Sequence, residues 1–358
     1  MREPLRYAVV GCGRIAPLHL EAIGGHPRAR LAATCDIVGE RARRAAQRFG
    51  APVHTTSYEE LFASSAVDAV SLALPHHLHG EAIVAAAEAG LHVFCEKPIA
   101  IGPEEADRAI AACRRAGVQL GVCYQNRYNQ ASQLLRGAVD AGRFGTLLQA
   151  AITFQNRKEP GYYTRDEWRG RWATEGGGVL TTQGIHTLDL MLWLMGPARQ
   201  AAGRIATLVH EVEVEDTAAA TIEFASGALG VITATTGSHT SWSQRLELSG
   251  TKGKAVLHNN RLVEWEFADG APDRQEALAV DEPAGAPDER GRYGPGHRRI
   301  LAHFVDCVLD GRPFPLDGGE GRKISELLWV IYESARFRRG APVRLDSPQR
   351  EDRHHHDG

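Results

Sequence analysis

A short stretch near the N-terminus, "YAVVGCGRIAPLHL", constrains the fold more than any other feature of the sequence. An apolar run is followed by Gly11, Gly13 and Ala16 in G-x-G-x-x-A order, and a helical pattern begins there. In such a strand–turn–helix unit the first glycine permits the tight turn, the second lets backbone approach a pyrophosphate, and the small third residue allows close packing of helix on strand. The helix N-terminus would offer free N–H groups to phosphates, so the stretch predicts a dinucleotide site that includes Arg14 and Ile15.

The acidic residue that ends the next apolar run, "LAATCDI", indicates which dinucleotide is bound. Asp36 lies 20 positions after Ala16, where such folds place the carboxylate that binds the adenosine ribose hydroxyls. A carboxylate about 4 Å from a 2′-phosphate costs about 1 kcal/mol per charge pair in water and about 4 kcal/mol at an effective dielectric of about 20. The sequence therefore predicts NAD rather than NADP. An alternative stays open, because Arg41, Arg43 or Arg44 could reach a 2′-phosphate, although a solvated helical face is their simpler interpretation.

Two patterns divide the chain. Up to residue 125, short apolar runs such as "DAVSLALP" and "HVFCEKP" alternate with Ala-rich helical segments. This βαβ alternation predicts a parallel sheet of the Rossmann type over residues 1–125. Over 126–345, segments such as "DTAAATIEFASGALGVITATT" read as strands joined by Gly-centred turns, which predicts a largely antiparallel sheet in a second domain. The fold class is therefore α/β, and residues 346–358 form a polar tail.

Composition excludes several classes of function. A formal charge of −3 implies no basic face for nucleic acid, and no stretch approaches the roughly 20 apolar residues of a membrane span. The N-terminus lacks the long apolar region of a signal peptide. The cysteines show no C-x-x-C spacing, which predicts reduced thiols in a cytoplasmic protein and no metal site. They are Cys12, Cys35, Cys95, Cys113, Cys123 and Cys307.

Two segments carry weaker signals. Residues 268–297 are rich in Pro, Gly and polar residues, which is typical of a mobile excursion, either an active-site lid or an insertion. The tail contains His354, His355 and His356, which could bind a metal weakly, although a frayed tail is the simpler interpretation.

An ionisable pair stands where an apolar strand stops. In "HVFCEKPIA" the run that ends at Cys95 is followed at once by Glu96, Lys97 and Pro98. Strand ends in an α/β sheet face the ligand crevice, so these charges are candidates for chemistry. A solvated loop with an incidental ion pair is the alternative.

Together with "ALPHHLHGEAIVAAAEAGLHVFCEKPIA" and "GGGVLTTQGIHTLDLMLWLMG", these features resemble the glucose–fructose oxidoreductase / inositol dehydrogenase / MocA family, from residue 6 to about 345. The resemblance implies a Rossmann domain and a C-terminal α/β domain with a large open sheet, often used to form oligomers, here a homodimer or homotetramer. It implies hydride transfer between a sugar or cyclitol CH–OH and a nicotinamide. By this resemblance Lys97 is the catalytic lysine, Pro98 follows a cis peptide and His186 is the acid/base. The implied cofactor contacts are Pro75, His76, His79, Glu96, Lys97, Trp168 and Arg169.

The sequence departs from the common G-G-G-x-L-x-D-x-G-x-H pattern of this family at Thr182, which replaces the aspartate. A hydroxyl can relay a hydrogen bond but is no carboxylate base. Asp189 lies three residues after His186 on a helical run, so it shares a helix face with it and could orient the imidazole, or form a buried structural pair. Arg127 and Tyr128 are candidate sugar contacts, with packing or interface roles equally open. The glycines at 176–178 predict close backbone approach to a ligand, or a flexible loop.

These observations predict an NAD-preferring dehydrogenase of a small polyol, sugar, cyclitol or nucleotide sugar, without nucleic-acid or membrane partners. His186 suits the base because its ordinary pKa is near neutrality. Lys97 can donate to the substrate oxygen, and we expect its pKa to be lowered beside the nicotinamide cation. Two alternatives share the fold: an enzyme that uses redox transiently for elimination or glycoside cleavage, and a non-catalytic dinucleotide-binding sugar sensor.

Overall fold

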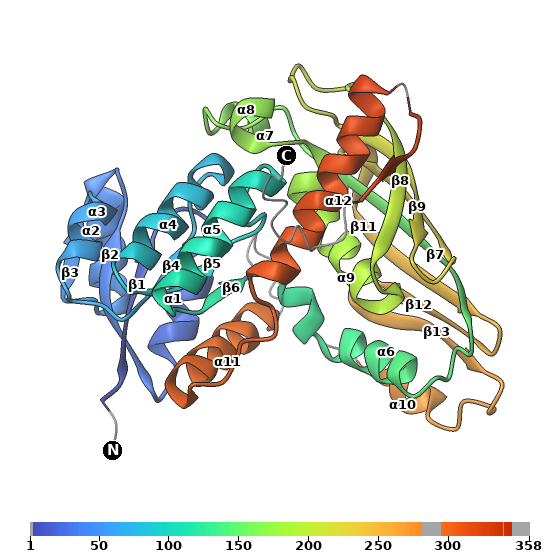
Figure 1. Ribbon diagram of the computed structural model, residues 1–358, viewed down its shortest axis with the longest axis horizontal. Coiled ribbons are helices and arrows are strands. Elements are labelled where there is room, and N and C mark those ends of the chain that lie inside the picture. Colours follow the sequence, from blue (N-terminus) through green and yellow to red (C-terminus); the bar gives the residue numbers. More distant parts are fainter. Residues whose placement is uncertain (1–2, 281–294, 339, 346–358) are drawn as a thin grey trace, which may run out of the picture.

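Two sheets organise the chain, one in each of two lobes that meet in a V (Figure 1). The computed structural model describes residues 3–280, 295–338 and 340–345, without the side chains at 240 and 241. The predicted tail, residues 346–358, and part of the predicted excursion, residues 281–294, lie outside the described residues. Of that excursion, the described part contains α10 (Arg274–Ala279).

The first lobe is a parallel six-stranded sheet of order β3-β2-β1-β4-β5-β6, which confirms the predicted Rossmann fold. Its helices cover both faces (Figure 1). The strands are β1 (Leu5–Val10), β2 (Ala29–Cys35), β3 (Val53–Thr55), β4 (Ala69–Leu72), β5 (His92–Cys95) and β6 (Leu120–Val122). The helices are α1 (Ala16–Gly24), α2 (Gly39–Phe49), α3 (Tyr58–Ala63), α4 (His79–Glu88) and α5 (Pro103–Ala116), with 3₁₀ turns η1 (His76–Leu78) and η2 (Gln125–Tyr128).

The strand β3 was not apparent in the sequence. It has three residues, and the first two are exposed, so it lacks the apolar run that marks the other five. It forms because β2 offers an unpaired edge, with Ala33 to Cys35 in register with Val53 to Thr55. Edge pairing of this kind depends on backbone hydrogen bonds rather than on side-chain burial.

The second lobe contains an eight-stranded sheet of order β13-β12-β11-β7-β10-β9-β8-β14. Its pairs are antiparallel except β7 with β10, so the predicted mostly antiparallel sheet is confirmed. The strands are β7 (Leu147–Arg157), β8 (Ala198–Ala206), β9 (Thr217–Phe224), β10 (Leu229–Thr235), β11 (Gly237–Gly250), β12 (Gly253–His258), β13 (Arg261–Phe267) and β14 (Val343–Arg344). The helices are α6 (Gln130–Asp140), α7 (Gly161–Thr164), α8 (Trp172–Glu175), α9 (Ile185–Met195), α11 (Gly296–Asp310) and α12 (Gly318–Phe337), with a π-helical turn η3 (Leu180–Gly184).

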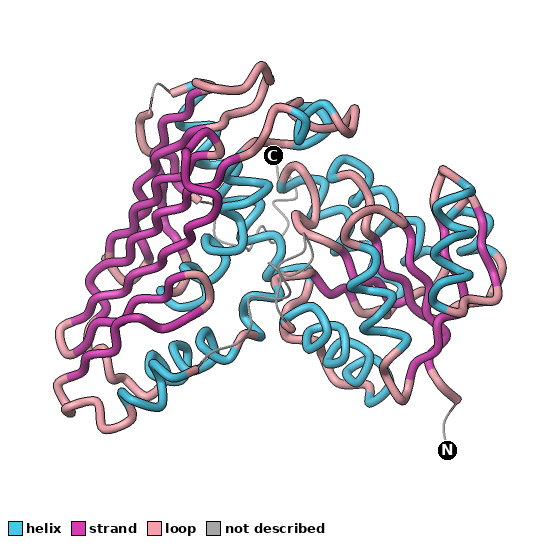
Figure 2. The backbone as a smooth tube through the Cα atoms, turned by 180° about the vertical axis from the view of Figure 1, so that it is seen from behind, coloured by secondary structure: helices cyan, strands magenta, loops and turns pink. Residues whose placement is uncertain are grey.

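The two faces of this sheet differ. α9 and α12 lie on the inner face, and Figure 2 shows the strands of the outer face without a helix in front of them. Along β10 the side chains alternate, with Ile232 buried and Leu229 and Val231 exposed at 60% and 45%. Exposed apolar faces favour association, so the predicted homodimer or homotetramer stays a prediction that light scattering would test against the 38.9 kDa of one chain.

The chain crosses back to the first lobe after the second sheet. α11 packs on α1 and β5, and α12 packs on α5 and β6. Arg28 in the first lobe binds Asp306 and Asp310 of α11, at 2.9 and 2.6 Å. A division of the chain at residue 125 therefore separates the sheets but not the two C-terminal helices, which contact both lobes. Among the helices of the described residues, none has the length and apolarity needed to cross a membrane.

Candidate active site

Lys97 lies at the carboxyl end of β5, where the two lobes meet. The strand residues Val93, Phe94 and Cys95 are fully buried, and the Lys97–Pro98 peptide is cis, as the resemblance implied. The Lys97 Nζ donates to the main-chain carbonyl of Thr182 at 2.8 Å, which joins the first lobe to η3 of the second. Burial lowers the Lys97 pKa to about 8, although the Glu96 carboxylate opposes this shift. The expected lowering is thus present before any nicotinamide is considered.

His186 stands in the first turn of α9, directly after the π-helical turn η3. Single π-turns occur often at functional sites because they change which side chains a helix presents. Burial and then the nearby Lys97 charge hold the His186 pKa well below its ordinary value. The imidazole is therefore neutral near pH 7 and able to accept a proton. Its Nδ1 has no hydrogen-bond partner within the described residues.

Asp189 does not orient His186. Its carboxylate instead accepts from the Arg127 guanidinium, from Nε at 2.9 Å and from Nη2 at 2.7 Å. Both side chains are buried, and Arg127 also binds Glu320 of α12 at 2.9 Å. A cation is a better partner for a buried carboxylate than a neutral imidazole is, and the Arg127 guanidinium reaches Asp189 from η2. The sequence spacing put Asp189 on the correct helix but could not show this distant partner.

Arg127 and Tyr128 thus have packing roles in this structure. Arg127 joins three elements through its two carboxylate partners, and Tyr128 Oη lies 2.7 Å from His303 Nδ1 in α11. These contacts correspond to the packing alternative rather than to sugar binding. Polar atoms of both side chains have partners within the protein, and a sugar contact by either residue stays a prediction.

Thr182 presents its carbonyl, and not its hydroxyl, to the lysine. The Thr182 Oγ1 donates to the carbonyl of Gly178 at 2.8 Å, one helical turn earlier, while the carbonyl of Thr182 accepts from Lys97. A hydroxyl already used in this way supplies no relay in the present arrangement. The neutral residue in place of the common aspartate is therefore accommodated by a local hydrogen bond.

Glu215 holds the glycine loop in place. No motif in the sequence marks this residue. Its carboxylate accepts from the N–H of Gly178 at 2.7 Å, the N–H of Leu180 at 3.0 Å and the Tyr332 hydroxyl at 2.7 Å. An ideal Cβ on Gly178 would lie 1.7 Å from the Glu215 carbonyl oxygen, so only glycine fits. The glycines at 176–178 are thus held in place, in contrast to the flexible loop that was the alternative.

We expect Glu215 to make stability depend on pH. Burial outweighs its three donors and raises its pKa to about 7, from 4.5. The folded state therefore holds a proton between these values that the unfolded state has lost, so the stabilisation present below pH 4.5 disappears as the pH rises through about 7. Glu215→Gln, which mimics the protonated acid, should reduce the loss of unfolding free energy over this range by up to about 3 kcal/mol.

Urea denaturation at pH 5, 6, 7 and 8 measures this effect. Glu211→Gln, at an exposed neighbour on the same segment, is the matched control and should keep the wild-type slope. Identical pH slopes for wild type and Glu215→Gln would contradict the assignment.

The predicted phosphate loop forms between β1 and α1. Gly11 has φ +89°, and a Cβ there would lie 2.3 Å from the carbonyl oxygen of Ala73, so the tight turn requires glycine. A Cβ on Gly13 would meet no atom within 4 Å, which leaves the open backbone that a pyrophosphate needs. Ala16 is buried where α1 begins. Arg14 and Ile15 lie between them, with the Arg14 guanidinium 5.6 Å from the Tyr162 ring centre.

Asp36 ends β2 beside this loop. Its carboxylate accepts from the N–H of Cys12 and from the N–H of Val38, both at 2.8 Å. It therefore stabilises the loop, and its predicted contact with the adenosine ribose stays a prediction. Of the arginines that left NADP open, Arg43 and Arg44 bind Glu40, and the charge on Arg41 acts on Cys12.

The other predicted cofactor contacts fall into two groups. Pro75 precedes η1, where the His76 ring packs at 4.9 Å from Trp168 of the second lobe. Arg169 binds Glu175, whose carbonyl lies 2.8 Å from His76 Nδ1. The structure thus brings His76, Trp168 and Arg169 together where the two lobes meet.

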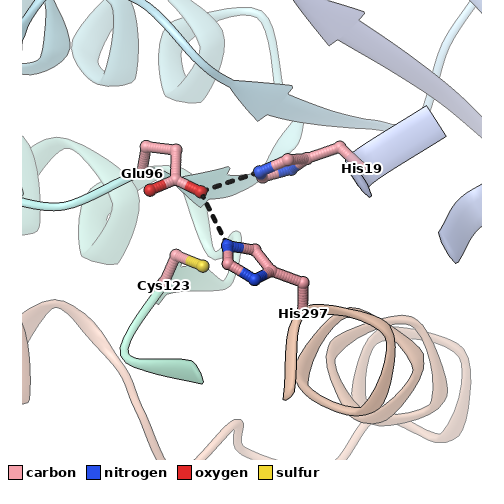
Figure 3. Close-up of side chains that lie close together, drawn as sticks. All are labelled: His19, Glu96, Cys123 and His297. Carbon is pink, nitrogen blue, oxygen red and sulfur yellow. Dashed lines mark hydrogen bonds and ion pairs between the residues drawn. The ribbon is translucent and has the colours of Figure 1, made fainter. Parts of the chain in front are cut away.

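His79 and Glu96 are instead turned into the protein. Both His79 ring nitrogens lie at carbonyls, Nδ1 at 2.6 Å from Pro98 and Nε2 at 2.9 Å from Leu74. The imidazole therefore has no nitrogen left for a cofactor, and it positions the turn around Pro98. The Glu96 carboxylate is buried beside His19 and His297 (Figure 3). His79, at the start of α4, and Glu96, directly after β5, are both buried.

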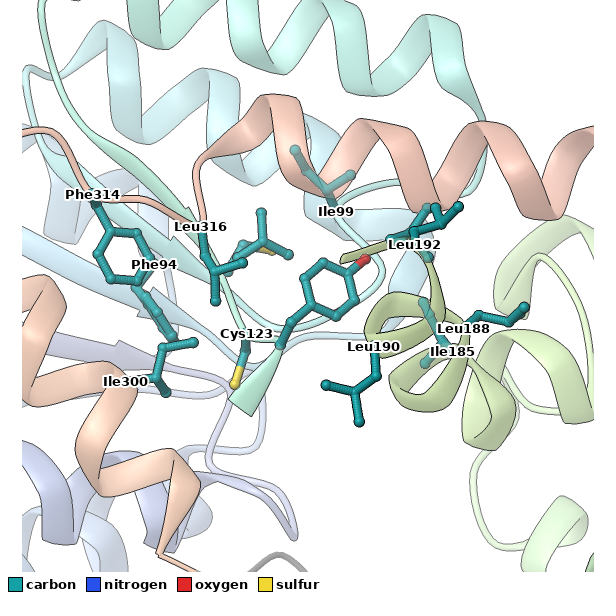
Figure 4. Packing of buried hydrophobic residues seen from close by; sticks show 14 of the residues in the cluster. Phe94, Ile99, Cys123, Ile185, Leu188, Leu190, Leu192, Ile300, Phe314 and Leu316 are labelled. Atoms are coloured by element: carbon teal, nitrogen blue, oxygen red, sulfur yellow. The ribbon is translucent and has the colours of Figure 1, made fainter. Parts of the chain in front are cut away.

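Apolar packing joins the segments that carry the two catalytic candidates, Lys97 and His186. Phe94 and Ile99 of the first lobe belong to the same buried cluster as Ile185 and Leu188 of α9 (Figure 4). Leu316, before α12, lies in this cluster too, between strand ends and helix. Interiors packed in this way resist small shifts, so the relative position of Lys97 and His186 is set by the core.

Comparison with known proteins agrees with this geometry. Residues 5–124 match the family described as "Oxidoreductase family, NAD-binding Rossmann fold", and residues 132–256 match the GFO/IDH/MocA C-terminal domain. The chain is 28% identical to myo-inositol 2-dehydrogenase of Thermotoga maritima, over 95% of this chain and 98% of that protein. It is 26% identical to levoglucosan dehydrogenase of Pseudarthrobacter phenanthrenivorans, over 83% and 85%.

Among solved structures, the WlbA dehydrogenase from Bordetella pertussis, in complex with NADH and UDP-GlcNAcA, superposes with a TM-score of 0.87. The two sequences are 32% identical, over 96% of this chain and 100% of that one. With both domains matched and a relative of this identity over nearly the whole chain, the protein belongs to the GFO/IDH/MocA family of NAD-binding oxidoreductases.

Proposed function

We propose that this protein transfers hydride between a CH–OH carbon of a sugar, cyclitol or nucleotide sugar and NAD. One observation carries the proposal: Lys97 and His186 come from different lobes, and the Lys97 Nζ is bound to the carbonyl of Thr182, one turn before His186. The Lys97 charge acts on the His186 imidazole, so a cation and a proton acceptor lie close together where the two lobes meet.

The residues of the first lobe fit a dinucleotide. Gly13 leaves open backbone beside the start of α1, and Asp36 is placed at the end of β2. When bound, the nicotinamide supplies the carbon that accepts or returns a hydride. The protein would hold the adenosine end of the cofactor at Asp36 and the phosphates at the Gly11–Gly13 turn. The nicotinamide ring would then lie where the two lobes meet.

In the oxidation direction, His186 would take the hydroxyl proton of the substrate, and a nicotinamide held by the first lobe would supply the hydride acceptor. Its neutral imidazole, kept so by burial, can accept this proton at neutral pH. An ammonium has three N–H donors, and Thr182 takes one of those on Lys97, so others can stabilise the alkoxide character of the substrate oxygen. In reduction the same groups return the proton.

A screen for NADH formation over cyclitols, aldoses, uronates and nucleotide sugars tests the proposal. The relatives named above act on or bind a cyclitol, an anhydrosugar and a nucleotide sugar, so all these classes belong in the screen. Net NADH with an oxidised product supports the proposal. Product formed with NAD returned unchanged would instead show transient redox, and binding without turnover over the whole panel would indicate a sensor.

Cofactor preference follows from Asp36. We expect NAD to bind at least about tenfold more tightly than NADP, because the buried carboxylate repels a 2′-phosphate. Asp36→Asn removes the charge and keeps one acceptor for the loop N–H groups, so it should reduce the difference in affinity between NAD and NADP. Calorimetric titration with both cofactors measures this difference in affinity. Arg41→Ala is titrated alongside, because Arg41 could reach a 2′-phosphate. Wild-type affinity for NADP equal to that for NAD would overturn the expectation.

A further inference from the structure

Four side chains of metal-binding type converge beneath the Lys97 site (Figure 3). They are His19 in α1, Glu96 after β5, Cys123 after β6 and His297 at the start of α11. Their ligating atoms all lie within 4.8 Å of one another, and all four residues are buried. None of the four is adjacent in sequence to another, so the fold alone assembles the set.

The ligand types and their spacing fit a four-coordinate zinc ion. Zn²⁺ is bound by imidazole nitrogen, thiolate and carboxylate at about 2.0–2.3 Å, which places tetrahedral ligands about 3.4 Å apart. The His19 and His297 Nε2 atoms lie 2.8 and 3.6 Å from the same oxygen, Glu96 Oε1. To reach coordination distances, the widest separation would contract by up to about 1.4 Å, and the 2.8 Å between His19 Nε2 and Glu96 Oε1 would open by about 0.6 Å.

The charges around Glu96 are compatible with an ion in the cluster. The buried Glu96 carboxylate interacts with the Lys97 charge, and the cluster itself adds two imidazoles and a thiol. A divalent cation would neutralise the Glu96 carboxylate and a Cys123 thiolate together, leaving a site with no net charge. The cysteine is free, as this requires.

Protein ligands fill all four positions, which is typical of a structural zinc site rather than a catalytic one. α11 reaches the first lobe only after the chain has passed through β7 to β13 of the second sheet. An ion at this point would join its first turn to α1 and to the ends of β5 and β6. It would thus fix the strand end that carries Lys97.

We propose that His19, Glu96, Cys123 and His297 form a structural site for a divalent transition-metal ion of the zinc type, which ties α11 to the first lobe. The sequence predicted no metal site, because that prediction rested on local cysteine spacing. The competing explanation is a metal-free hydrogen-bond network around Glu96, to which the Cys123 thiol contributes a hydrogen bond and no metal ligand.

Metal content and thermal stability of the full-length protein distinguish the two. The background variant H354A/H355A/H356A removes the tail histidines, which would otherwise bind metal on their own. Purified under reducing conditions and loaded with zinc, it should retain about one ion per chain after gel filtration. Chelator should lower its Tm, and zinc should restore it. Cys123→Ala should abolish both effects, while Cys113→Ala, at another buried cysteine, should keep them.

Cobalt provides a readout that does not depend on the variants folding. Added to the metal-free background protein, Co²⁺ should give the visible bands of tetrahedral coordination and the near-ultraviolet band of a cobalt–thiolate bond. Zinc retention without dependence on Cys123, a Tm unchanged by chelator and zinc, or cobalt spectra without the thiolate band would each overturn the proposal. None of these measurements uses turnover, so they stand apart from the test of the proposed function.

Discussion

His186→Ala is expected to lower kcat/KM for the alcohol substrate by about 10²–10⁴-fold, or roughly 2.7–5.4 kcal/mol of transition-state stabilisation, while NAD affinity stays nearly unchanged. Under the proposed function this imidazole takes the substrate proton, and it lies on the second lobe, whereas the phosphate loop and Asp36 belong to the first. Lys97→Met should lower kcat/KM over a similar range, because it removes the donor that stabilises the substrate oxygen.

Thr182→Val is the matched control. It keeps the main-chain carbonyl that accepts from Lys97 and loses only the hydroxyl that donates to Gly178, so it should cost far less activity than His186→Ala. Steady-state kinetics with calorimetric NAD titration on each variant separates chemistry from binding. If Thr182→Val were as damaging as His186→Ala in a folded protein, the hydroxyl would be an obligatory relay and the assignment of the base would fail.

Gly178→Ala is expected to destabilise the protein by about 3 kcal/mol or more. The added methyl would lie 1.7 Å from the carbonyl oxygen of Glu215, and that atom belongs to the backbone, so no rotamer change relieves the clash. The loop must move, which breaks the hydrogen bonds from the N–H groups of Gly178 and Leu180 to the Glu215 carboxylate. Activity should fall with stability, because this loop leads into the turn that contacts Lys97.

Gly137→Ala in α6 is the control for this experiment. A Cβ there meets no atom within 4 Å, and alanine is favoured over glycine in a helix by up to about 1 kcal/mol. Urea denaturation should therefore show the control equal to or more stable than wild type. A Gly178→Ala protein of wild-type stability would show that the loop is not held as the structure indicates.

Some expectations depended on local chemistry and others on distant contacts. Gly11 could be recognised from sequence because a positive φ after a strand leaves few alternatives to glycine. Asp189 could not be assigned, since the choice between His186 and Arg127 depends on where η2 lies relative to α9. His79 likewise matched a cofactor-contacting position in the sequence, but the sequence could not show that its ring nitrogens lie at the carbonyls of Pro98 and Leu74.

Local patterns along the chain were sufficient to predict the α/β alternation, the phosphate turn, the acid directly after β2 and the placement of Lys97 at a strand end. Each follows from periodicity or turn chemistry within a few residues, which tertiary contacts do not change. Three contacts could be found only in the folded structure: Glu215 holds the glycine loop, Arg127 binds Asp189, and His19 lies beside His297. The partners in these pairs lie tens to hundreds of positions apart, and their contact is set by how the two lobes and the returning α11 pack.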